Sequence, residues 1–240
     1  MKKIIFLLII SANFYFAQNE KVFDHSVFTE LLSKNVDSEG MINYAGFDNP
    51  QFGEYLNRLG SADTEGFEEE EKLAFYINTY NAFVIKNVLN HYPIEGPMKV
   101  EGFFDNFKFN ITGEEMSLNQ LEYDIILKIE PVLTHFGLVC AAVSCPKLLK
   151  FAYTGDNVYE LLRENGKVFL SDPKRNYLDK EKNILYLSEI FRWFRESFEK
   201  EYGSLENAVK KLGAATTADY LDKNDVTIEF ITYDWSLNSQ

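Results

Sequence analysis

The chain has 240 residues, of which 46% are hydrophobic and 25% are charged, a balance that excludes a collagen-like, low-complexity or mainly disordered protein. Its formal net charge of −13 argues against nucleic-acid binding, because no surplus of Lys and Arg exists to neutralise phosphates. Its two cysteines can form one bridge or one small reactive site, but not a disulfide framework.

The first residues have the pattern of a secretory signal peptide. Lys2 and Lys3 precede an apolar run over residues 4–10, which is too short to span a bilayer. We expect cleavage after Ala17, which leaves residues 18–240 as the mature chain. No later segment has the length or apolarity of a membrane span. The sequence therefore predicts an exported protein, periplasmic or secreted, in a compartment that permits a disulfide.

Patterns typical of helices and of strands alternate along the mature chain. Apolar periodicity predicts helices at residues 22–32, 52–59, 68–89, 117–126, 158–170 and 190–198, and further helices after Pro146 and Ser204. Strands are predicted at residues 40–44, 107–111, 136–140 and 226–231, and a hairpin at residues 177–187. These elements follow no regular βαβ period and no linker rich in Pro, Gly or Ser separates them. We therefore predict a single α+β domain in which antiparallel strands and hairpins pack with several helices.

Residues 134–148 are the most informative segment, because they contain both cysteines and one of three histidines. If Pro146 is the first residue of a helix, Cys145 is its N-cap, and its sulfur faces unpaired backbone N–H groups. The helix dipole then lowers the pKa of the thiol and favours the nucleophilic thiolate. His135 can act as its base if the predicted strand brings the ring close.

At this point the sequence resembles the domain of unknown function 547 family, an uncharacterised family of bacteria and plants. The resemblance rests on four blocks in chain order, residues 74–82, 117–122, 135–148 and 233–238, and weaker agreement extends it over most of residues 40–238. In the first block Tyr76 stands where the family usually has tryptophan. The family's activity is not known, so the resemblance implies site positions rather than a reaction. These positions are Asn78, Asn81, Glu122, His135, Cys140, Cys145 and Asp234.

Our leading hypothesis is a thiol-dependent hydrolase or acyltransferase. Cys145 is its nucleophile, His135 its base and Glu122 the acid that orients the histidine. The candidate substrate-binding residues, for a small-molecule or peptide ligand, are Asn78, Asn81 and Asp234.

Two other interpretations fit the same residues. Cys140 and Cys145 can form a structural disulfide, and the protein is then a non-catalytic periplasmic binding or scaffold domain. Alternatively, His135, Glu122 and both sulfurs can hold zinc in a metal-dependent hydrolase, although their spacing matches no familiar zinc finger or ribbon. No other cofactor is expected.

The polar candidates also have structural alternatives. Asn78 and Asn81 share one face of a predicted hydrophobic helix, where their amides can bind a loop rather than a substrate. Asp234 can cap backbone amides beneath an aromatic seal formed by its neighbours. His25 and His91 have no supporting residues nearby in the sequence and receive no role.

Overall fold

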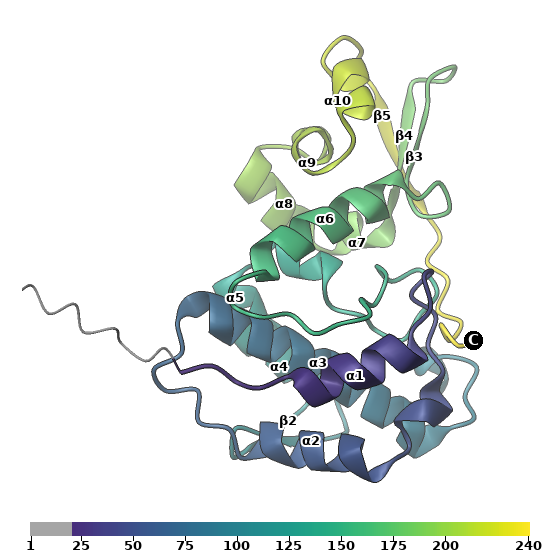
Figure 1. The fold of residues 1–240 in the computed structure, drawn as a ribbon. Helices are drawn as coiled ribbons and strands as arrows, with labels where there is room; N and C mark the ends of the chain where they lie inside the picture. Colours follow the sequence, from purple (N-terminus) through teal and green to yellow (C-terminus); the bar gives the residue numbers. More distant parts are fainter. Residues whose placement is uncertain (1–20) are drawn as a thin grey trace, which may run out of the picture.

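In the computed structural model, which describes residues 21–240, the long helix α3 (Glu69–His91) is the centre of the N-terminal half (Figure 1). Glutamates fill its first turn, where negative charge is favourable, and the helix ends shortly before Pro93, as the sequence predicts. Apolar side chains cover most of its sides. Helix α2 (Pro50–Gly60) packs against it, and α1 (Ser26–Asn35) packs against α2. These three helices confirm the predicted N-terminal helices.

A short hairpin leads from α3 towards the functional region. Strands β1 (Phe109–Ile111) and β2 (Glu114–Met116) pair in antiparallel fashion. Ser117 and Gln120 then form the predicted capping box, which opens α4 (Leu118–Leu121). The helix continues as a π-helical segment, Glu122–Ile126, before the short α5 (Leu127–Ile129). Such π-helical turns occur frequently at functional sites.

The C-terminal half combines helices with a three-stranded sheet. Its helices are α6 (Val158–Ser171), α7 (Glu189–Trp193), α8 (Arg195–Tyr202), α9 (Leu205–Leu212) and α10 (Ala215–Leu221). Its strands β3 (Tyr177–Asp179), β4 (Ile184–Ser188) and β5 (Thr227–Ile231) lie in the order β3-β4-β5. The predicted hairpin is β3-β4, whereas β5 pairs with β4 in parallel, which differs from the antiparallel arrangement expected. The fold class predicted from the sequence, α+β, is confirmed.

Several local predictions in this half need adjustment. The helix expected at residues 190–198 is two helices, because the backbone at Phe194 leaves helical geometry (φ −109°, ψ 24°) and α8 starts afresh. The helix after Ser204 is confirmed, and Ser204 caps it by accepting a hydrogen bond from the Asn207 amide. Helix α10 has no counterpart among the predicted elements.

Two predictions around the cysteines are wrong. Residues 136–140 form no strand: a 3₁₀ turn, Leu133–Phe136, leads into irregular chain, whose backbone groups at Gly137 and Val139 pair with the Asn81 side chain instead of a neighbouring strand. Residues 146–157 form no helix, because side chains from other elements take up their backbone groups. Asn165 donates to the Lys147 carbonyl, for example.

The C-terminal segment, residues 232–240, returns from β5 to the N-terminal half, where Figure 1 shows it in yellow beside the end of α1 and the chain that follows it. There the Ile42 amide donates to the Asn238 carbonyl, and an isolated bridge joins Ile42 to Ser239. Bridges of this kind replace the short strand predicted at residues 40–44. The segment thus connects both halves across the region of the cysteines. No helix within residues 21–240 is both long and apolar enough to cross a bilayer, and the predicted signal peptide, residues 1–17, lies outside the described residues.

Candidate functional site

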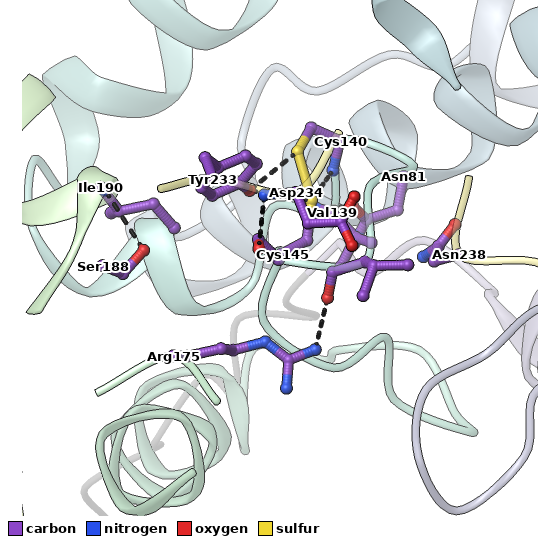
Figure 2. The surroundings of a disulfide bond; sticks show 12 residues. Asn81, Val139, Cys140, Cys145, Arg175, Ser188, Ile190, Tyr233, Asp234 and Asn238 are labelled. Carbon is purple, nitrogen blue, oxygen red and sulfur yellow. Dashed lines mark hydrogen bonds between the residues drawn. A yellow bond between two sulfur atoms is a disulfide. The ribbon is translucent and has the colours of Figure 1, made fainter. Parts of the chain in front are cut away.

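Cys140 and Cys145 form a disulfide, which closes the loop of residues 140–145 (Figure 2). The Cys145 sulfur is buried and accepts a hydrogen bond from the Cys140 amide at 3.0 Å, whereas Cys140 is partly exposed. The Tyr233 hydroxyl lies 3.2 Å from the Cys140 sulfur and 3.3 Å from the Cys145 sulfur. The loop turns tightly at Ala141, a non-glycine residue with a left-handed backbone (φ 61°).

The disulfide loop is bound to the C-terminal segment by a ladder of hydrogen bonds. The Val143 amide donates to the Ser236 carbonyl, and the Asn238 amide donates to the Ala141 carbonyl. Asp234 belongs to this ladder: its own amide donates to the Ser144 hydroxyl, and its carboxylate accepts from the Ser236 amide at 2.9 Å. The hydrogen bond from the Ser236 hydroxyl, followed by the one from the Ser236 amide, holds the pKa of the Asp234 carboxyl group below its usual value. The structure therefore gives Asp234 the capping role and leaves it exposed on the segment.

Asn78 and Asn81 both bind the backbone of distant loops. The Asn78 side-chain NH₂ group donates to the Tyr153 carbonyl at 2.9 Å, and the Asn78 side-chain oxygen accepts from the Tyr153 backbone amide at 3.0 Å. Asn81 makes the same kind of paired contact, donating to the Gly137 carbonyl and accepting from the Val139 amide, each at 2.9 Å. Both side chains are buried. Asn81 thus positions the chain that leads into Cys140.

A cavity of about 140 Å³ lies beside the disulfide, and we call it the aromatic pocket. Its walls come from five parts of the chain: helix α3, helix α4 with the π-helical segment, the 3₁₀ turn, helix α7 and the C-terminal segment. Its lining residues are Tyr80, Phe104, Asn119, Glu122, Tyr123, His135, Leu138, Cys140, Ile190, Trp193, Phe194, Tyr233 and Trp235. The predicted residues Glu122, His135 and Cys140 therefore meet in one cavity, whereas Cys145, Asn78, Asn81 and Asp234 do not line it.

Glu122 is the acidic group of the pocket, and it begins the π-helical segment. Burial raises the pKa of its carboxyl group from 4.5 to about 7, and a hydrogen bond from the Tyr80 hydroxyl opposes this only in part. The same burial and the nearby Glu122 charge raise the pKa of Tyr80. A carboxyl group whose pKa lies near neutrality, in a cleft, is a frequent sign of a functional site.

His135 contributes a neutral ring. It is 5% exposed and stacks on Phe194 with ring centroids 3.7 Å apart. Burial lowers the pKa of the ring to about 3, although a hydrogen bond to the Pro131 backbone works against this. Its Nε2 atom makes no hydrogen bond with any atom of the described chain. The bond to Pro131 therefore falls to Nδ1, and Nε2 is left as an acceptor.

Aromatic side chains form the remaining walls. Trp193, Tyr233 and Trp235 pack against one another with ring centroids 4.7–5.7 Å apart. Trp193 and Tyr123 are also 44% and 52% exposed, so they form the rim of the pocket. Sequence reasoning did not select Tyr80, Tyr123 or Trp193. Tyr80 and Tyr123 stand two residues or fewer from selected positions, but nothing in the sequence shows which side of each helix faces a cavity.

The predicted Cys145 N-cap is wrong in this structure. No helix starts at Pro146. Cys145 is 1% exposed, and its sulfur is bonded to that of Cys140. Nor do the residues weighed as zinc ligands form such a site: within residues 21–240, no group of three or more His, Cys, Asp or Glu side chains is arranged to hold a metal ion. The disulfide that the sequence left as an alternative is the form present.

The fold and site define an α+β domain with an aromatic pocket beside a disulfide. The family model described as "Protein of unknown function, DUF547" matches residues 64–170 of the chain, and this match supports the assignment to that family. This confirms the resemblance: the matched region contains the first three sequence blocks and Glu122, His135, Cys140 and Cys145, whereas the block at residues 233–238 lies beyond it. No curated protein and no solved structure matches the chain.

Proposed function

We propose that this protein is an exported binding domain, whose aromatic pocket takes a small molecule with an apolar body and a polar group. One observation carries the proposal: seven aromatic side chains and the Glu122 carboxyl group line a single cavity. Binding pockets for small molecules typically combine apolar and aromatic walls with a few polar groups that fix orientation. The leader-like pattern of residues 1–17 and the Cys140–Cys145 disulfide support export, because disulfides persist in oxidising compartments.

The disulfide also argues for binding rather than thiol chemistry. A thiolate is the nucleophile in cysteine catalysis, and a sulfur bonded to another sulfur cannot supply one. The disulfide fixes the loop of residues 140–145. This loop places Cys140 in the pocket wall, and its hydrogen bonds hold the C-terminal segment that carries Tyr233 and Trp235. Its role in the proposed function is therefore to hold two walls of the pocket together.

A fluorescence titration tests the binding function directly. The chain has two tryptophans, Trp193 and Trp235, and both line the pocket, so their emission reports on this site alone. We expect a saturable change in emission with at least one of three fragments that share one apolar body: cyclohexylmethanol, cyclohexanecarboxylate and cyclohexylmethylamine. The Tyr123→Ala variant should weaken that binding about fivefold, the loss of one aromatic contact.

Tyr177→Ala is the matched control. Tyr177 is a similarly exposed aromatic residue on β3, and it does not line the pocket, so its removal should leave the titration unchanged. If no fragment gives a saturable change, or if both variants respond alike, the pocket is not a binding site and the proposal fails.

A thiol-dependent hydrolase or acyltransferase with Cys145, His135 and Glu122 is the second candidate. It is favoured by one observation, that Glu122 and His135 line the same cavity as Cys140, the disulfide partner of Cys145. It requires a reduced protein. Mass spectrometry after reduction and treatment with a thiol-directed acylating probe should then show label on Cys145 and none in Cys145→Ala. Unlabelled Cys145 in the reduced, folded protein would remove this candidate.

A further inference from the structure

The only formal charge among the lining residues of the aromatic pocket, all of them described, is negative. Glu122 is its acidic group, and none of the lining residues, all drawn from the described part of the chain, is Lys or Arg. His135 adds no positive charge, because its ring stays neutral. The protein as a whole carries a formal charge of −13. An anionic ligand would therefore find no counter-charge in this cavity, whereas a cation would meet a carboxyl group in partly buried surroundings.

The pocket also offers a hydrogen-bond acceptor that has no donor among the described residues. A buried polar atom without a partner costs free energy, and such atoms in folded proteins call for a specific explanation. His135 Nε2 is such an atom, and in the neutral ring it can only accept. An ionised Glu122 also only accepts. A ligand that carries hydrogen-bond donors would satisfy both groups.

The aromatic walls fit a positive charge in addition. Trp193, Tyr233 and Trp235 present rings to the cavity, and ring faces attract cations, tryptophan most strongly. Partly desolvated sites strengthen this attraction. Charge, donor capacity and ring faces thus favour the same kind of ligand.

We propose that the aromatic pocket binds a small organic cation that carries N–H donors, a protonated primary amine or an amidine, on an apolar body. This inference rests on the binding function proposed above. The Glu122 carboxylate pairs with the positive charge, His135 Nε2 accepts one N–H group, and the rings of Trp193 and Trp235 contact both the charge and the apolar body.

Binding of this ligand should be coupled to a proton. The pKa of Glu122 is about 7, so below neutral pH the free pocket holds a proton that the cation must displace. Affinity should therefore rise as the pH increases from about 6 to 8. The titratable groups facing Glu122 do not interfere: burial raises the pKa of Tyr80, Tyr123 and Tyr233 above 10, and it lowers that of His135 to about 3.

Three probes with one apolar body test the charge and the donors separately. Cyclohexylmethylamine carries both, cyclohexylmethanol lacks the charge, and cyclohexylmethyl-trimethylammonium lacks the N–H donors. By titration calorimetry at pH 8 we expect the amine to bind about tenfold more tightly than either of the others, the size of one desolvated charge-assisted contact. Glu122→Gln should weaken amine binding about tenfold and alcohol binding less than about twofold.

Asp124→Asn is the matched control for the charge. Asp124 is an acid two residues away that is well exposed and does not line the pocket, so its variant should bind all probes as the wild type does. Trp193→Leu, at the exposed rim, provides a second variant whose folding is not at risk, and it should lower the preference for amine over alcohol about threefold.

The outcomes separate this inference from the binding function. Equal affinity for amine and alcohol, or tightest binding by cyclohexanecarboxylate, would overturn the cation and leave the pocket as a binding site. A trimethylammonium probe that binds as tightly as the amine would overturn the requirement for N–H donors. Absence of binding by every probe would overturn the binding function and this inference together.

Discussion

Two regions of this protein each withdraw a glutamate from solvent, Glu71 fully and Glu122 in part, and they use it differently. At the first turn of α3, Glu71 is 6% exposed and accepts hydrogen bonds from the Phe23 amide at 2.8 Å and the Gly155 amide at 3.0 Å. In the aromatic pocket, Glu122 has the Tyr80 hydroxyl as partner, and burial raises its pKa to about 7. A buried carboxylate saturated by backbone donors stabilises a fold, whereas one with unused capacity is available to a ligand.

The same contrast separates the other polar residues. Asn78 and Asn81 have a structural role like that of Glu71, because their side-chain amide groups are paired with backbone groups of residues 137–153. His135 belongs with Glu122, since its Nε2 atom has no partner in the described chain. Buried polar residues near the pocket therefore divide into those that hold its walls and those that face its interior, and mutations should divide in the same way.

Asn81→Ala should have the largest effect on stability. The substitution removes the side chain that pairs with the Gly137 carbonyl and with the Val139 amide, so two buried backbone groups lose their partner. We expect the free energy of unfolding to fall by about 3 kcal/mol. Denaturant unfolding measures it. Asn57→Ala on the exposed side of α2 is the control and should change stability by less than about 0.5 kcal/mol. Equal effects of the two variants would contradict the positioning role of Asn81.

Removal of the disulfide should come next. Replacing both Cys140 and Cys145 with serine frees a short loop, and loop-closure entropy predicts a loss of about 2 kcal/mol in the free energy of unfolding. The aromatic walls should loosen too, because the C-terminal segment is bound to this loop. Acrylamide quenching of tryptophan emission should therefore increase in the double variant. Unchanged quenching would show that the disulfide does not hold the pocket walls.

The two glutamates provide the direct test of the comparison. Glu71→Gln turns one acceptor oxygen into a donor and leaves one backbone amide without its partner, so we expect a loss of about 1.5 kcal/mol at pH 7. Glu122→Gln removes an ionisable group whose charged form is disfavoured by burial, and its stability should differ from wild type by less than about 1 kcal/mol at that pH. The reverse order would contradict the assignment of Glu71 to the fold and Glu122 to the ligand.

The raised pKa of Glu122 should make the free energy of unfolding decrease gradually as the pH rises. Its pKa is 4.5 in the unfolded chain and about 7 in the folded protein, so the folded state holds the proton more tightly. This contribution is complete below pH 4.5 and is lost as the pH rises to 7. Relative to Glu122→Gln, the wild type should lose up to about 1 kcal/mol per pH unit between pH 5 and 7.

His25 and His135 change stability in the opposite sense, but equally in both proteins. Burial lowers the pKa of each to about 3, so their contribution is complete above pH 6.5 and is lost as the pH falls. The difference between wild type and Glu122→Gln therefore isolates the carboxyl group. A difference that does not vary with pH would show that Glu122 titrates normally.

Much of the fold could be predicted because its signals are local. The acidic first turn and Pro93 bound α3, and the Ser117–Gln120 capping box marks the start of α4, since each depends on residues within one or two helical turns. Predictions failed where distant side chains replaced local partners. Asn81 pairs with the backbone at residues 137–139 and prevents a strand, and Asn165 binds the Lys147 carbonyl within the segment expected to be a helix.

The sequence by itself determined the fold class and the resemblance to the family, and it included Glu122, His135 and Cys140 among seven candidate positions, because residue type and spacing reveal helices, caps and unusual polar residues in apolar surroundings. Only the tertiary structure decided that Cys145 is a buried disulfide partner rather than a thiolate, that Asn78 and Asn81 bind loops, and that Trp193 and Trp235 face the same cavity. Burial and hydrogen-bond partners determine the role of a polar side chain, and both depend on residues far away in the chain.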